Sequence, residues 1–545
     1  MKVRAAVARV LKQEGVECLF GYPRNPVIES AAEADIRTII VRQERTGVHM
    51  ADALSRVTCG DKVGVFAMQH GPGTENAFGG VAQAFADSVP LVVLPAGYSR
   101  DVGNIFPNFS ALQNFDKVTK WLEQPTLGRV VPDALRRAFT QAKNGRPGPT
   151  MVELPTDLLD EDMPDFADHR PTRRLRSSPD ATAVSEVAEA LVAARVPVIY
   201  AGQGIHYAKA WPQLKALAEM LEAPVCTSLA GKSAFPENHP LALGSGGVTY
   251  SKQLAHFLAK ADVIFGIGCS FTSTGFGIAM PAGKSYIHAT LDPIDIDKDL
   301  RSDLSLVGDA ALTLDMLCAE VADRLKAAGR APTGETAKEL ARVKQEWLAE
   351  WAGALNSESR PLSPYRVVRD LMNTLDPARC IVTHDAGSPR NQIVPFWESP
   401  EPMTYIGWGK STQLGYGLGL AMGAKLARPD MMCVNVWGDA AIGFTGMDLE
   451  TAAREGLPIL SILFNNSTMA IEHRWMPAAT EKYRSTDVSG DYTMFARSMG
   501  CWAERVEEPG QIVPAIQRAV RAIEEGKPAL LEFITEYSSP ASMYR

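Results

Sequence analysis

The sequence predicts an α/β protein built from three consecutive doubly wound parallel-sheet domains. Short apolar runs rich in valine, isoleucine and leucine alternate with helical patterns along the whole chain. Strands that are buried on both faces and alternate with helices are typical of parallel sheets covered on both sides. Two linker-like stretches, 160–181 (charged, with prolines) and 327–364 (glycine and proline at its ends, a charged helical pattern between), divide the 545 residues into pieces of ordinary domain size. We therefore expect domains at 1–165, 182–326 and 360–545.

Each domain contains its own strand and helix candidates. In the first domain, strands are expected at 63–68 and 91–94, with a helix at 75–86 between them. In the second, strands are expected at 197–201, 224–227 and 263–267, with a helix at 211–221. In the third, strands are expected at 381–383, 432–436, 459–464 and 529–534, with helices at 415–426 and 448–455. Ligands of such sheets bind beyond the carboxyl ends of the strands, so the loops that follow the strands are the candidate sites.

Composition excludes several classes of protein. The net charge of −8 argues against a nucleic-acid binder, which should show a basic face. The longest apolar run, about 89–97, falls well short of the ~20 residues that a membrane-spanning helix needs. Residues 1–21 mix charges into an apolar pattern and are expected to form an amphipathic helix rather than a signal peptide. The eight cysteines are scattered singly, so we expect a cytoplasmic protein with reduced thiols, without a membrane or nucleic-acid partner.

Two polar residues follow neighbouring strands of the third domain. Asp439 comes after the strand at 432–436, and Asn466 comes after the next strand, at 459–464. One βαβ unit separates them, so adjacent strand ends can bring them together. A carboxylate oxygen, an amide oxygen and a loop carbonyl suit Mg²⁺, and a single acid suits a metal that a diphosphate already neutralises. The alternative is a helix cap at Asp439 and a turn at Asn465-Asn466.

The same segment, Gly438-Asp439-Ala440 to Asn465-Asn466, resembles the signature of the thiamine diphosphate (ThDP) enzymes of the acetolactate synthase and 2-oxo acid decarboxylase family. That signature begins Gly-Asp-Gly and ends Asn-Asn, and Ala440 is the one departure. The resemblance extends along nearly the whole chain. It implies a pyrimidine-binding first domain, a central domain and a diphosphate-binding third domain. It also implies that Asp439, the Asn466 side chain and the backbone carbonyl of Thr468 hold Mg²⁺.

Glu44 matches the family's glutamate segment. It lies in Val41-Arg42-Gln43-Glu44, before a helical pattern at 45–55. The resemblance implies that Glu44 hydrogen-bonds the N1′ nitrogen of the aminopyrimidine. A carboxyl there favours the imino tautomer, whose N4′ can take the proton from thiazolium C2. The alternative for Glu44 alone is a solvated residue at a helix start.

Other segments match the family's cofactor contacts. The loop 69–76, with Gly71-Pro72-Gly73, resembles the one that lies over the cofactor from the partner subunit, although a plain turn explains it equally. Gln69 and His70 are catalytic candidates, and His70 is either a proton donor or a structural residue. The turn 385–388 resembles the diphosphate-contacting turn. Leu414 would be the apolar wedge beneath the cofactor, unless it is a core residue, and Thr412 would offer a backbone carbonyl to N4′. The cofactor-binding candidates are Pro23, Asn76, Gly387, Ser388, Thr412, Leu414, Gly438, Asp439, Ala440, Ala441, Asn466, Thr468 and Met469.

Three substrate loops depart from the acetolactate synthase pattern. Phe-Gln-Glu reads Phe106-Pro107-Asn108, Pro-Lys-Asp reads Pro155-Thr156-Asp157, and Arg-Phe-Asp-Asp-Arg reads 270–274 without either arginine. These positions help to grip the second 2-oxo acid in that enzyme, so carboxylate recognition must differ here or be absent. Trp475 lies where synthases place a substrate-contacting tryptophan, or is a core residue.

Glu472 favours a different outcome. Pyruvate decarboxylase-like enzymes place a proton-relaying glutamate there, and a proton delivered after CO₂ loss releases an aldehyde. Their paired histidines are not found after Gly97, however. The alternative is that Glu472 pairs with His473 or Arg474 at the surface.

Three functions therefore stay open: acetolactate synthase-like decarboxylation with carboligation, a 2-oxo acid decarboxylase or related lyase that releases an aldehyde, and a non-catalytic ThDP- or FAD-binding regulatory protein. Retention of Glu44 argues against the third. FAD or ADP could bind the central domain, but Gly202-Gln203-Gly204 lacks the third glycine of a dinucleotide motif, which would fall at Tyr207. The resemblance also implies a small 2-oxo acid substrate and a homodimer or homotetramer with cofactor halves from different subunits.

Overall fold

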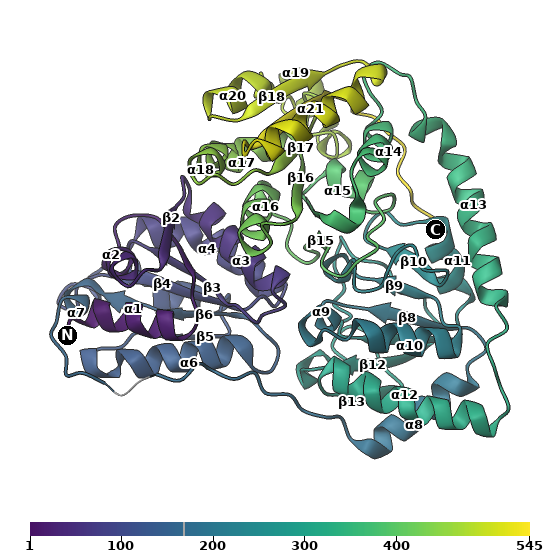
Figure 1. The fold of residues 1–545 in the computed structure, drawn as a ribbon, viewed down its shortest axis with the longest axis horizontal. Coiled ribbons are helices and arrows are strands. Elements are labelled where there is room, and N and C mark those ends of the chain that lie inside the picture. Colours follow the sequence, from purple (N-terminus) through teal and green to yellow (C-terminus); the bar gives the residue numbers. More distant parts are fainter. Residues whose placement is uncertain (167–168, 545) are drawn as a thin grey trace.

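Three parallel sheets organise the chain, and helices cover both faces of each (Figure 1). The computed structural model describes residues 1–166 and 169–544. All pairs of named strands in these residues run parallel, which confirms the predicted α/β class with three doubly wound domains. Among the described residues, no helix is both long enough and apolar enough to cross a membrane.

The first sheet has the strand order β2-β1-β3-β4-β6-β5, and β7 pairs with β4. Its strands are β1 (Cys18–Gly21), β2 (Arg37–Ile40), β3 (Gly64–Met68), β4 (Leu91–Gly97), β5 (Trp121–Glu123), β6 (Pro149–Val152) and β7 (Leu154–Pro155). Its helices are α1 (Val3–Gln13), α2 (Pro26–Glu33), α3 (Glu44–Val57), α4 (Pro72–Ala86), α5 (Ala111–Phe115), α6 (Val131–Lys143) and α7 (Thr156–Leu159).

Three expectations for this domain were wrong in their bounds, and one of them is β4, which runs three residues beyond the expected 91–94. The amphipathic helix expected over 1–21 ends at Gln13, because Gly15 takes a φ of 80° and the chain turns into β1. The helix expected from 75 begins at Pro72, a residue whose missing N–H and fixed φ suit the first turn.

The second sheet has the order β10-β9-β8-β11-β12-β13. Its strands are β8 (Pro197–Ala201), β9 (Val225–Thr227), β10 (Ala242–Ser245), β11 (Val263–Ile267), β12 (Ser285–Thr290) and β13 (Leu304–Val307). Its helices are α8 (Ala181–Ala193), α9 (Gly204–Ala208), α10 (Trp211–Leu221), α11 (Lys252–Lys260) and α12 (Ala310–Ala327). The 21-residue α13 (Glu335–Leu355) follows and runs along the outside of the second and third domains (Figure 1).

The third sheet has the order β15-β14-β16-β17-β19-β18. Its strands are β14 (Cys380–His384), β15 (Tyr405–Ile406), β16 (Met432–Gly438), β17 (Leu460–Asn465), β18 (Trp502–Val506) and β19 (Ala529–Ile534). Its helices are α14 (Pro364–Thr374), α15 (Ser388–Ile393), α16 (Tyr416–Ala427), α17 (Asp439–Thr445), α18 (Leu449–Arg454), α19 (Pro477–Tyr483), α20 (Tyr492–Ser498) and α21 (Ile512–Glu524).

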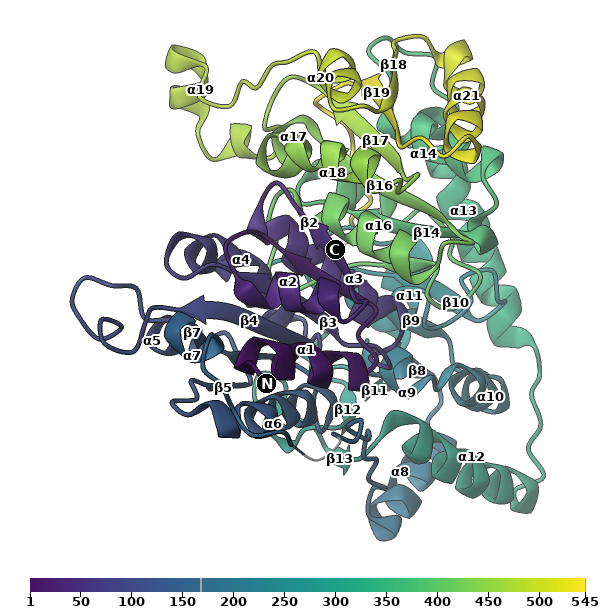
Figure 2. The same cartoon turned by 60° about the vertical axis from the view of Figure 1, so that its left-hand side comes forward.

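The first and third domains meet through α3 and α16, which lie side by side in both ribbon views (Figures 1 and 2). Two glycines of α16 make this close packing feasible. A Cβ at Gly423 would lie 2.2 Å from the carbonyl oxygen of Met50, and one at Gly419 would lie 2.5 Å from the His49 Cβ. Side chains of both helices share one hydrophobic core, so the two domains are packed as a unit.

A buried polar cluster joins the same two helices. Arg56 of α3 donates to Asp52 at 2.5 Å, to Asp87 at 3.1 Å and to the Tyr416 hydroxyl at 3.1 Å. Arg56 also reaches the carbonyl oxygen of Gly407 at 2.9 Å. Because every member is buried, the loss of one partner would leave a charge uncompensated, and the cluster therefore fixes the relative placement of the two helices.

Candidate active site

Asp439 and Asn466 meet at the carboxyl edge of the third sheet. Strands β16 and β17 are neighbours, with Gly438 opposite Phe464, so the residues that follow them emerge together. The backbone N–H of Asn466 donates to Asp439 Oδ2 at 3.0 Å, and that of Ala440 donates to Asp439 Oδ1 at 2.8 Å. The structure therefore brings together the two residues for which the sequence predicts metal binding.

Asp439 is a buried carboxylate without a cation. It is 6% exposed and forms no ion pair within the described residues. Burial raises its pKa, while the N–H groups of the loop act in the opposite direction. A bound cation would compensate this charge. The Asp439 carboxylate, the amide oxygen of Asn466 and the carbonyl of Thr468 are hard oxygen donors that fit Mg²⁺.

The rest of a metal shell would have to come from a ligand. In the part of the chain that the structure describes, no three histidine, cysteine, aspartate or glutamate side chains form a group that could hold a metal. Such a one-acid site suits Mg²⁺ that is also bound by a diphosphate. The roles of Asp439, Asn466 and Thr468 stay predictions on this basis.

Sequence reasoning missed Glu532, whose carboxylate holds the loop 465–468 in place through Asn465. Glu532 is fully buried in β19 and accepts a hydrogen bond from Asn465 Nδ2 at 2.7 Å. Asn465 in turn accepts the N–H of Ser467 at 3.0 Å, and Ser467 adopts a left-handed φ of 59°. Arg505 also donates to Glu532. A glutamate inside an apolar strand run was the signal, because a buried carboxylate requires partners.

The residues that follow the Asp439–Asn466 site contradict two of the structural alternatives, surface pairing of Glu472 and a core position for Trp475. His473 Nε2 lies 2.7 Å from Thr468 Oγ1, and Arg474 lies over the Trp475 ring. Within the described residues Glu472, which is half-buried, therefore pairs with neither neighbour. Trp475 is 72% exposed in this chain, which contradicts the alternative of a core residue.

Asp385 holds the segment that ends at Leu414. Its Oδ1 accepts the N–H of Gly415 at 2.9 Å, and its Oδ2 accepts the N–H of Gly417 at 3.0 Å. Gly415 has a φ of 84°, which favours glycine. Burial raises the pKa of Asp385 to about 6, although these N–H groups oppose the rise. Leu414 is half-buried on the loop before α16 and packs against the core that the first and third domains share, so its role as a wedge stays a prediction.

The turn 385–388 leads from β14 into α15. Gly387 caps that helix with a φ of 87°, and Ser388 is its first residue. Both are half-buried, as are Thr412, Gly438, Ala440 and Met469, whereas Ala441 is buried in α17. Half-buried backbone of this kind is accessible to a ligand, and cofactor binding at these residues stays a prediction.

Glu44 is buried at the first position of α3. Its Oε2 accepts a hydrogen bond from Asn76 Nδ2 at 3.1 Å, and a Cβ at Gly73 would lie 3.3 Å from its Oε1. It is 5% exposed, which contradicts the alternative of a solvated residue. Burial raises the pKa of this carboxyl, and the bond from Asn76 opposes the rise. Asn76 and Pro23 are themselves exposed.

His70 and Gln69 are half-buried in the same loop. The His70 ring lies 4.5 Å from that of Tyr98, and its Nδ1 is buried without a hydrogen-bond partner. Burial and the charge of Arg24 lower the pKa of His70, which favours the neutral ring. Within the described residues, no hydrogen bond or ion pair joins this loop or Glu44 to the Asp439 loop. The first domain does contact the loop before α16, where Gln413 donates to the Gly79 carbonyl of α4 at 2.6 Å.

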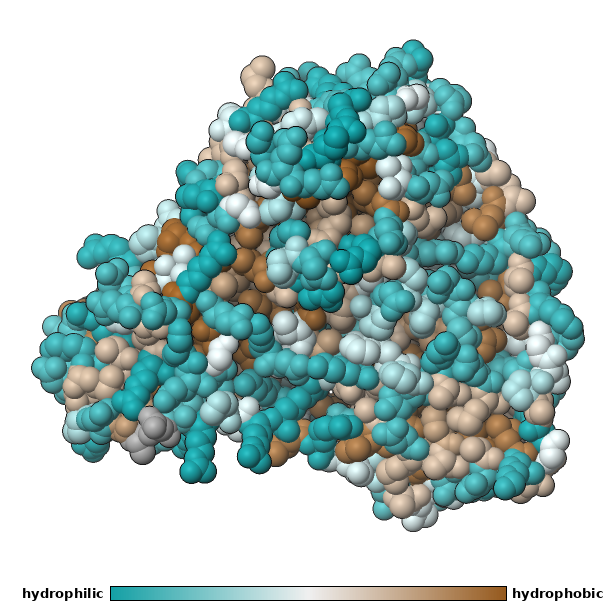
Figure 3. Space-filling model, in the orientation of Figure 1, coloured by the Kyte–Doolittle hydropathy of each residue, from teal (hydrophilic) through white to brown (hydrophobic). Residues whose placement is uncertain are grey.

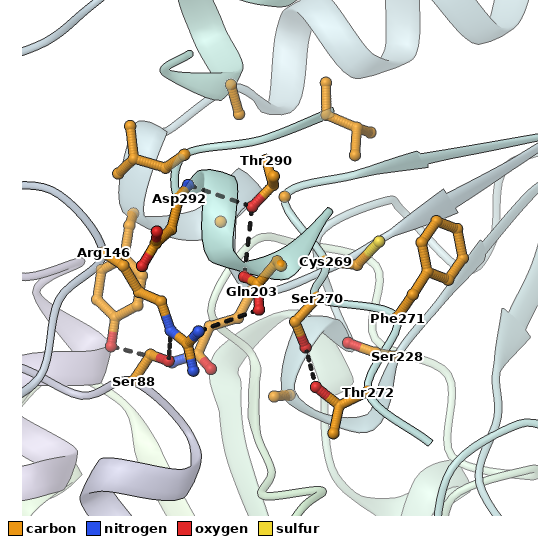
Figure 4. A pocket seen from close by; sticks show the side chains of 18 of the residues that line it. Ser88, Arg146, Gln203, Ser228, Cys269, Ser270, Phe271, Thr272, Thr290 and Asp292 are labelled. Carbon is orange, nitrogen blue, oxygen red and sulfur yellow. Dashed lines mark hydrogen bonds and ion pairs between the residues drawn. The ribbon is translucent and has the colours of Figure 1, made fainter. Parts of the chain in front are cut away.

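A separate cavity lies at the carboxyl ends of the second sheet, where the first domain faces it. Its lining is rich in hydroxyl groups, and Arg146 of the first domain reaches Ser88 at 2.8 Å on one side (Figure 4). On the other side, Ser270 and Thr272 are hydrogen-bonded to each other at 2.7 Å. The cavity volume of about 150 Å³ lies below the roughly 300–1,000 Å³ of sites for drug-sized ligands.

Comparison with known families decides between the open classes. The N-terminal TPP-binding domain of thiamine pyrophosphate enzymes matches residues 1–117, their central domain matches 184–317, and their C-terminal TPP-binding domain matches 385–533. The chain belongs to the thiamine pyrophosphate enzymes. The three matches follow the three sheets in order, so this thiamine pyrophosphate enzyme depends on ThDP and is not a non-catalytic regulatory protein.

Curated relatives of this thiamine pyrophosphate enzyme are acetolactate synthases. The chain is 30% identical to the probable acetolactate synthase large subunit of Methanocaldococcus jannaschii, over 98% of its own length and 92% of the relative. It is 29% identical to the acetolactate synthase isozyme 3 large subunit of Escherichia coli, with 96% and 92% covered. For the acetolactate synthase large subunit of Corynebacterium glutamicum the values are 29%, 97% and 86%. The chain is thus an enzyme of acetolactate synthase type.

The departures from the synthase pattern occupy distinct places in this thiamine pyrophosphate enzyme. Phe106 is 94% exposed on the loop before α5, and Thr156 begins α7. Ser270, Phe271, Thr272 and Thr274 line the cavity of the second domain. None of these three loops offers a lysine or arginine that could hold a carboxylate.

Proposed function

We propose that this enzyme binds ThDP with Mg²⁺, decarboxylates a small 2-oxo acid and joins the remaining fragment to a carbonyl acceptor. The observation that carries the proposal is the unpaired, buried carboxylate of Asp439 beside Asn466, in a chain that also buries Glu44. Similarity to acetolactate synthases over nearly the whole chain supports the carboligation. When bound, ThDP supplies the electron sink for breaking the bond between the carboxylate and the carbonyl carbon.

The residues of the third domain would bind the metal and the diphosphate and would set the bent shape of ThDP. Asp439, Asn466 and Thr468 would hold the metal through oxygen atoms. Leu414, whose position Asp385 fixes, would bend the ligand by filling the space beneath it. Half-buried N–H groups at Gly387 and Ser388 would meet phosphate oxygens, because exposed backbone N–H groups favour anions.

Glu44 would hold a proton at its carboxyl. Burial raises its pKa, so the protonated form is available nearer to neutral pH than for an exposed glutamate. Asn76 orients the carboxyl through its 3.1 Å hydrogen bond. A carboxyl held in this way could donate to a ring nitrogen of the bound aminopyrimidine and so favour its imino tautomer, whose exocyclic nitrogen can take a proton.

A second candidate is a 2-oxo acid decarboxylase that releases an aldehyde. The half-buried Glu472 favours it, because in the described residues its carboxyl has no partner and is therefore available to deliver a proton. Incubation of the ThDP- and Mg²⁺-loaded enzyme with a panel of 2-oxo acids separates the two. Hydroxyketone or 2-hydroxy-2-acyl acid products support carboligation, whereas aldehyde alone overturns it in favour of the second candidate.

We also propose that the enzyme is a homodimer or homotetramer. Apolar side chains gather along the boundary between the first domain, at the left, and the third, at the top (Figure 3). Large exposed apolar residues on α4, α17 and the loop before α5 suit burial by a second copy: Phe78, Phe85, Ile105, Phe106 and Phe444. Light scattering coupled to gel filtration tests this, and a monomer at micromolar concentration would contradict it.

A further inference from the structure

Lys410 lines the cavity of the second domain, and its side-chain nitrogen has no partner among the described residues. It lies on the loop between β15 and α16 and lines the cavity together with Gly409. In the described residues, its Nζ forms neither an ion pair nor a hydrogen bond. An ammonium group that is partly withdrawn from water without an acceptor is unfavourable, so the arrangement points to a ligand anion.

Asp87 and Asp295 are the two carboxylates whose charges act on Lys410, and both already have other hydrogen-bond or ion-pair partners. Asp87 accepts from Arg56 at 3.1 Å, from Gln83 at 3.3 Å and from the backbone N–H, not the ammonium, of Lys410 at 3.3 Å. Asp295 forms ion pairs with Arg146 at 3.0 Å and Lys298 at 2.5 Å. Burial lowers the pKa of Lys410, and the charge of Asp87 only partly opposes this. Neither acid therefore serves as its partner.

The other lining cations differ from Lys410 in this respect. Arg146 is paired with Asp295, and Arg174 donates to the carbonyl oxygens of Cys59 and Tyr207. Lys410 is thus the one cavity-lining lysine or arginine among the described residues whose charged group has no protein acceptor. Hydroxyl groups of the second domain (Ser228, Ser270, Thr272 and Thr274) supply further donors along the same wall.

Lys410, which lines the cavity, lies close along the chain to Thr412 of the proposed reaction centre. Lys410 precedes Thr412 by two residues, and two residues of chain span at most about 7 Å. Gly409 packs against the second domain, where a Cβ on it would lie 3.4 Å from the Leu229 Cβ. A ligand that reacts beside Thr412 and Leu414 can therefore extend into the cavity toward the ammonium of Lys410.

We propose that Lys410 binds a second carboxylate on the substrate, so that the enzyme prefers a 2-oxo dicarboxylic acid to a 2-oxo monocarboxylic acid. The inference rests on the proposed function, because it places the reacting 2-oxo group beside Thr412. A single ammonium matches a single carboxylate in charge. A phosphate dianion would instead face the carboxylates of Asp87 and Asp295 with only one free cation. The small cavity also suits a short aliphatic chain better than a large ligand.

Calorimetry on the enzyme loaded with ThDP and Mg²⁺ tests the inference without turnover. Glutarate serves as the dicarboxylate probe and butyrate as the monocarboxylate probe. A hydrogen bond to a charged group contributes about 1.5–3 kcal/mol, so Lys410→Met should weaken glutarate binding by about 10- to 100-fold. Lys410→Arg, which keeps the charge, should restore most of that affinity. Lys338→Met removes a lysine charge from an exposed ion pair with Glu335 on α13 and should leave glutarate binding unchanged.

Two results would overturn the inference. One is equal binding of glutarate and butyrate by the unmodified enzyme, and the other is unchanged glutarate binding in Lys410→Met. ThDP uptake by both variants shows that they are folded. If Lys410→Met loses glutarate binding but the unmodified enzyme turns over no 2-oxo acid, the proposed function is overturned and the carboxylate site stays in place. Turnover of 2-oxo acids with equal binding of glutarate and butyrate would leave the proposed function in place and overturn the carboxylate site.

Discussion

Asp385 Oδ1 lies 2.9 Å from the backbone nitrogen of Gly415, so a fully buried carboxylate fixes the residue that follows Leu414. Its other oxygen binds the N–H of Gly417 at 3.0 Å and so anchors the first turn of α16. Asp385 therefore links the turn after β14 to the segment that carries Leu414, and a substitution of Asp385 should change the position of both.

The raised pKa of Asp385 should make the free energy of unfolding depend on pH. Burial raises the pKa of Asp385 to about 6 from its ordinary value of 3.8. A raised carboxyl pKa means that the native state binds more protons in this window, so this group's contribution is full below pH 4 and is lost as pH rises to about 6. Asp385→Asn should remove this contribution, up to about 3 kcal/mol. The difference in unfolding free energy between the two proteins, measured in urea from pH 4 to pH 7, checks it, and a constant difference would contradict it.

Replacement of Glu44 should separate binding from chemistry. Glu44→Gln keeps the shape of the side chain but cannot exchange a proton, so turnover should fall by about 10²- to 10⁴-fold. ThDP affinity should change little. Glu33→Gln, at an exposed position of α2, is the matched control and should retain full activity. Activity of Glu44→Gln equal to that of the unmodified enzyme would refute the role of this carboxyl.

Glu532 should matter for both stability and metal binding. Glu532→Ala leaves Arg505, Asn465 and the Thr493 N–H without their acceptor, which costs about 3–5 kcal/mol of stability. Urea unfolding measures this, with the exposed Glu525→Ala as control. Since Asn465 positions the loop, Mg²⁺ affinity should also fall in Glu532→Ala. A stability change below about 1 kcal/mol would mean that the buried pairings are not formed.

Glu472 should control how the reaction ends. If it delivers the proton that releases an aldehyde, Glu472→Gln should lower aldehyde formation by about 10²-fold or more. Formation of the ligation product should fall less, so the product ratio shifts toward carboligation. Chromatographic analysis of both products from one reaction measures the ratio. An unchanged ratio would remove Glu472 from the proton-delivery step.

Much of the fold follows from local pattern. The elements β8, α10, β11 and β19 have the bounds that apolar periodicity predicts, because their runs are long and flanked by breakers. The proximity of Asp439 and Asn466 also follows, since consecutive strands of a parallel sheet end at one edge. These inferences need only the chain order and the burial of strands on both faces.

The support of the site does not follow from pattern. Asp385 binds N–H groups 30 and 32 residues away, and Glu532 binds Asn465 across 67 residues. The unpaired state of Lys410 likewise depends on which acids the fold gives to Arg56, Arg146 and Lys298. Such pairings are set by tertiary packing, and no local spacing encodes them.

The most direct test is calorimetric titration of ThDP into the protein with Mg²⁺, for the unmodified chain and for Asp439→Asn. We predict uptake of one ThDP per chain by the unmodified protein, and a large loss of affinity in Asp439→Asn because the metal loses its only carboxylate ligand. No uptake by the unmodified protein, or equal uptake by both, would contradict the account.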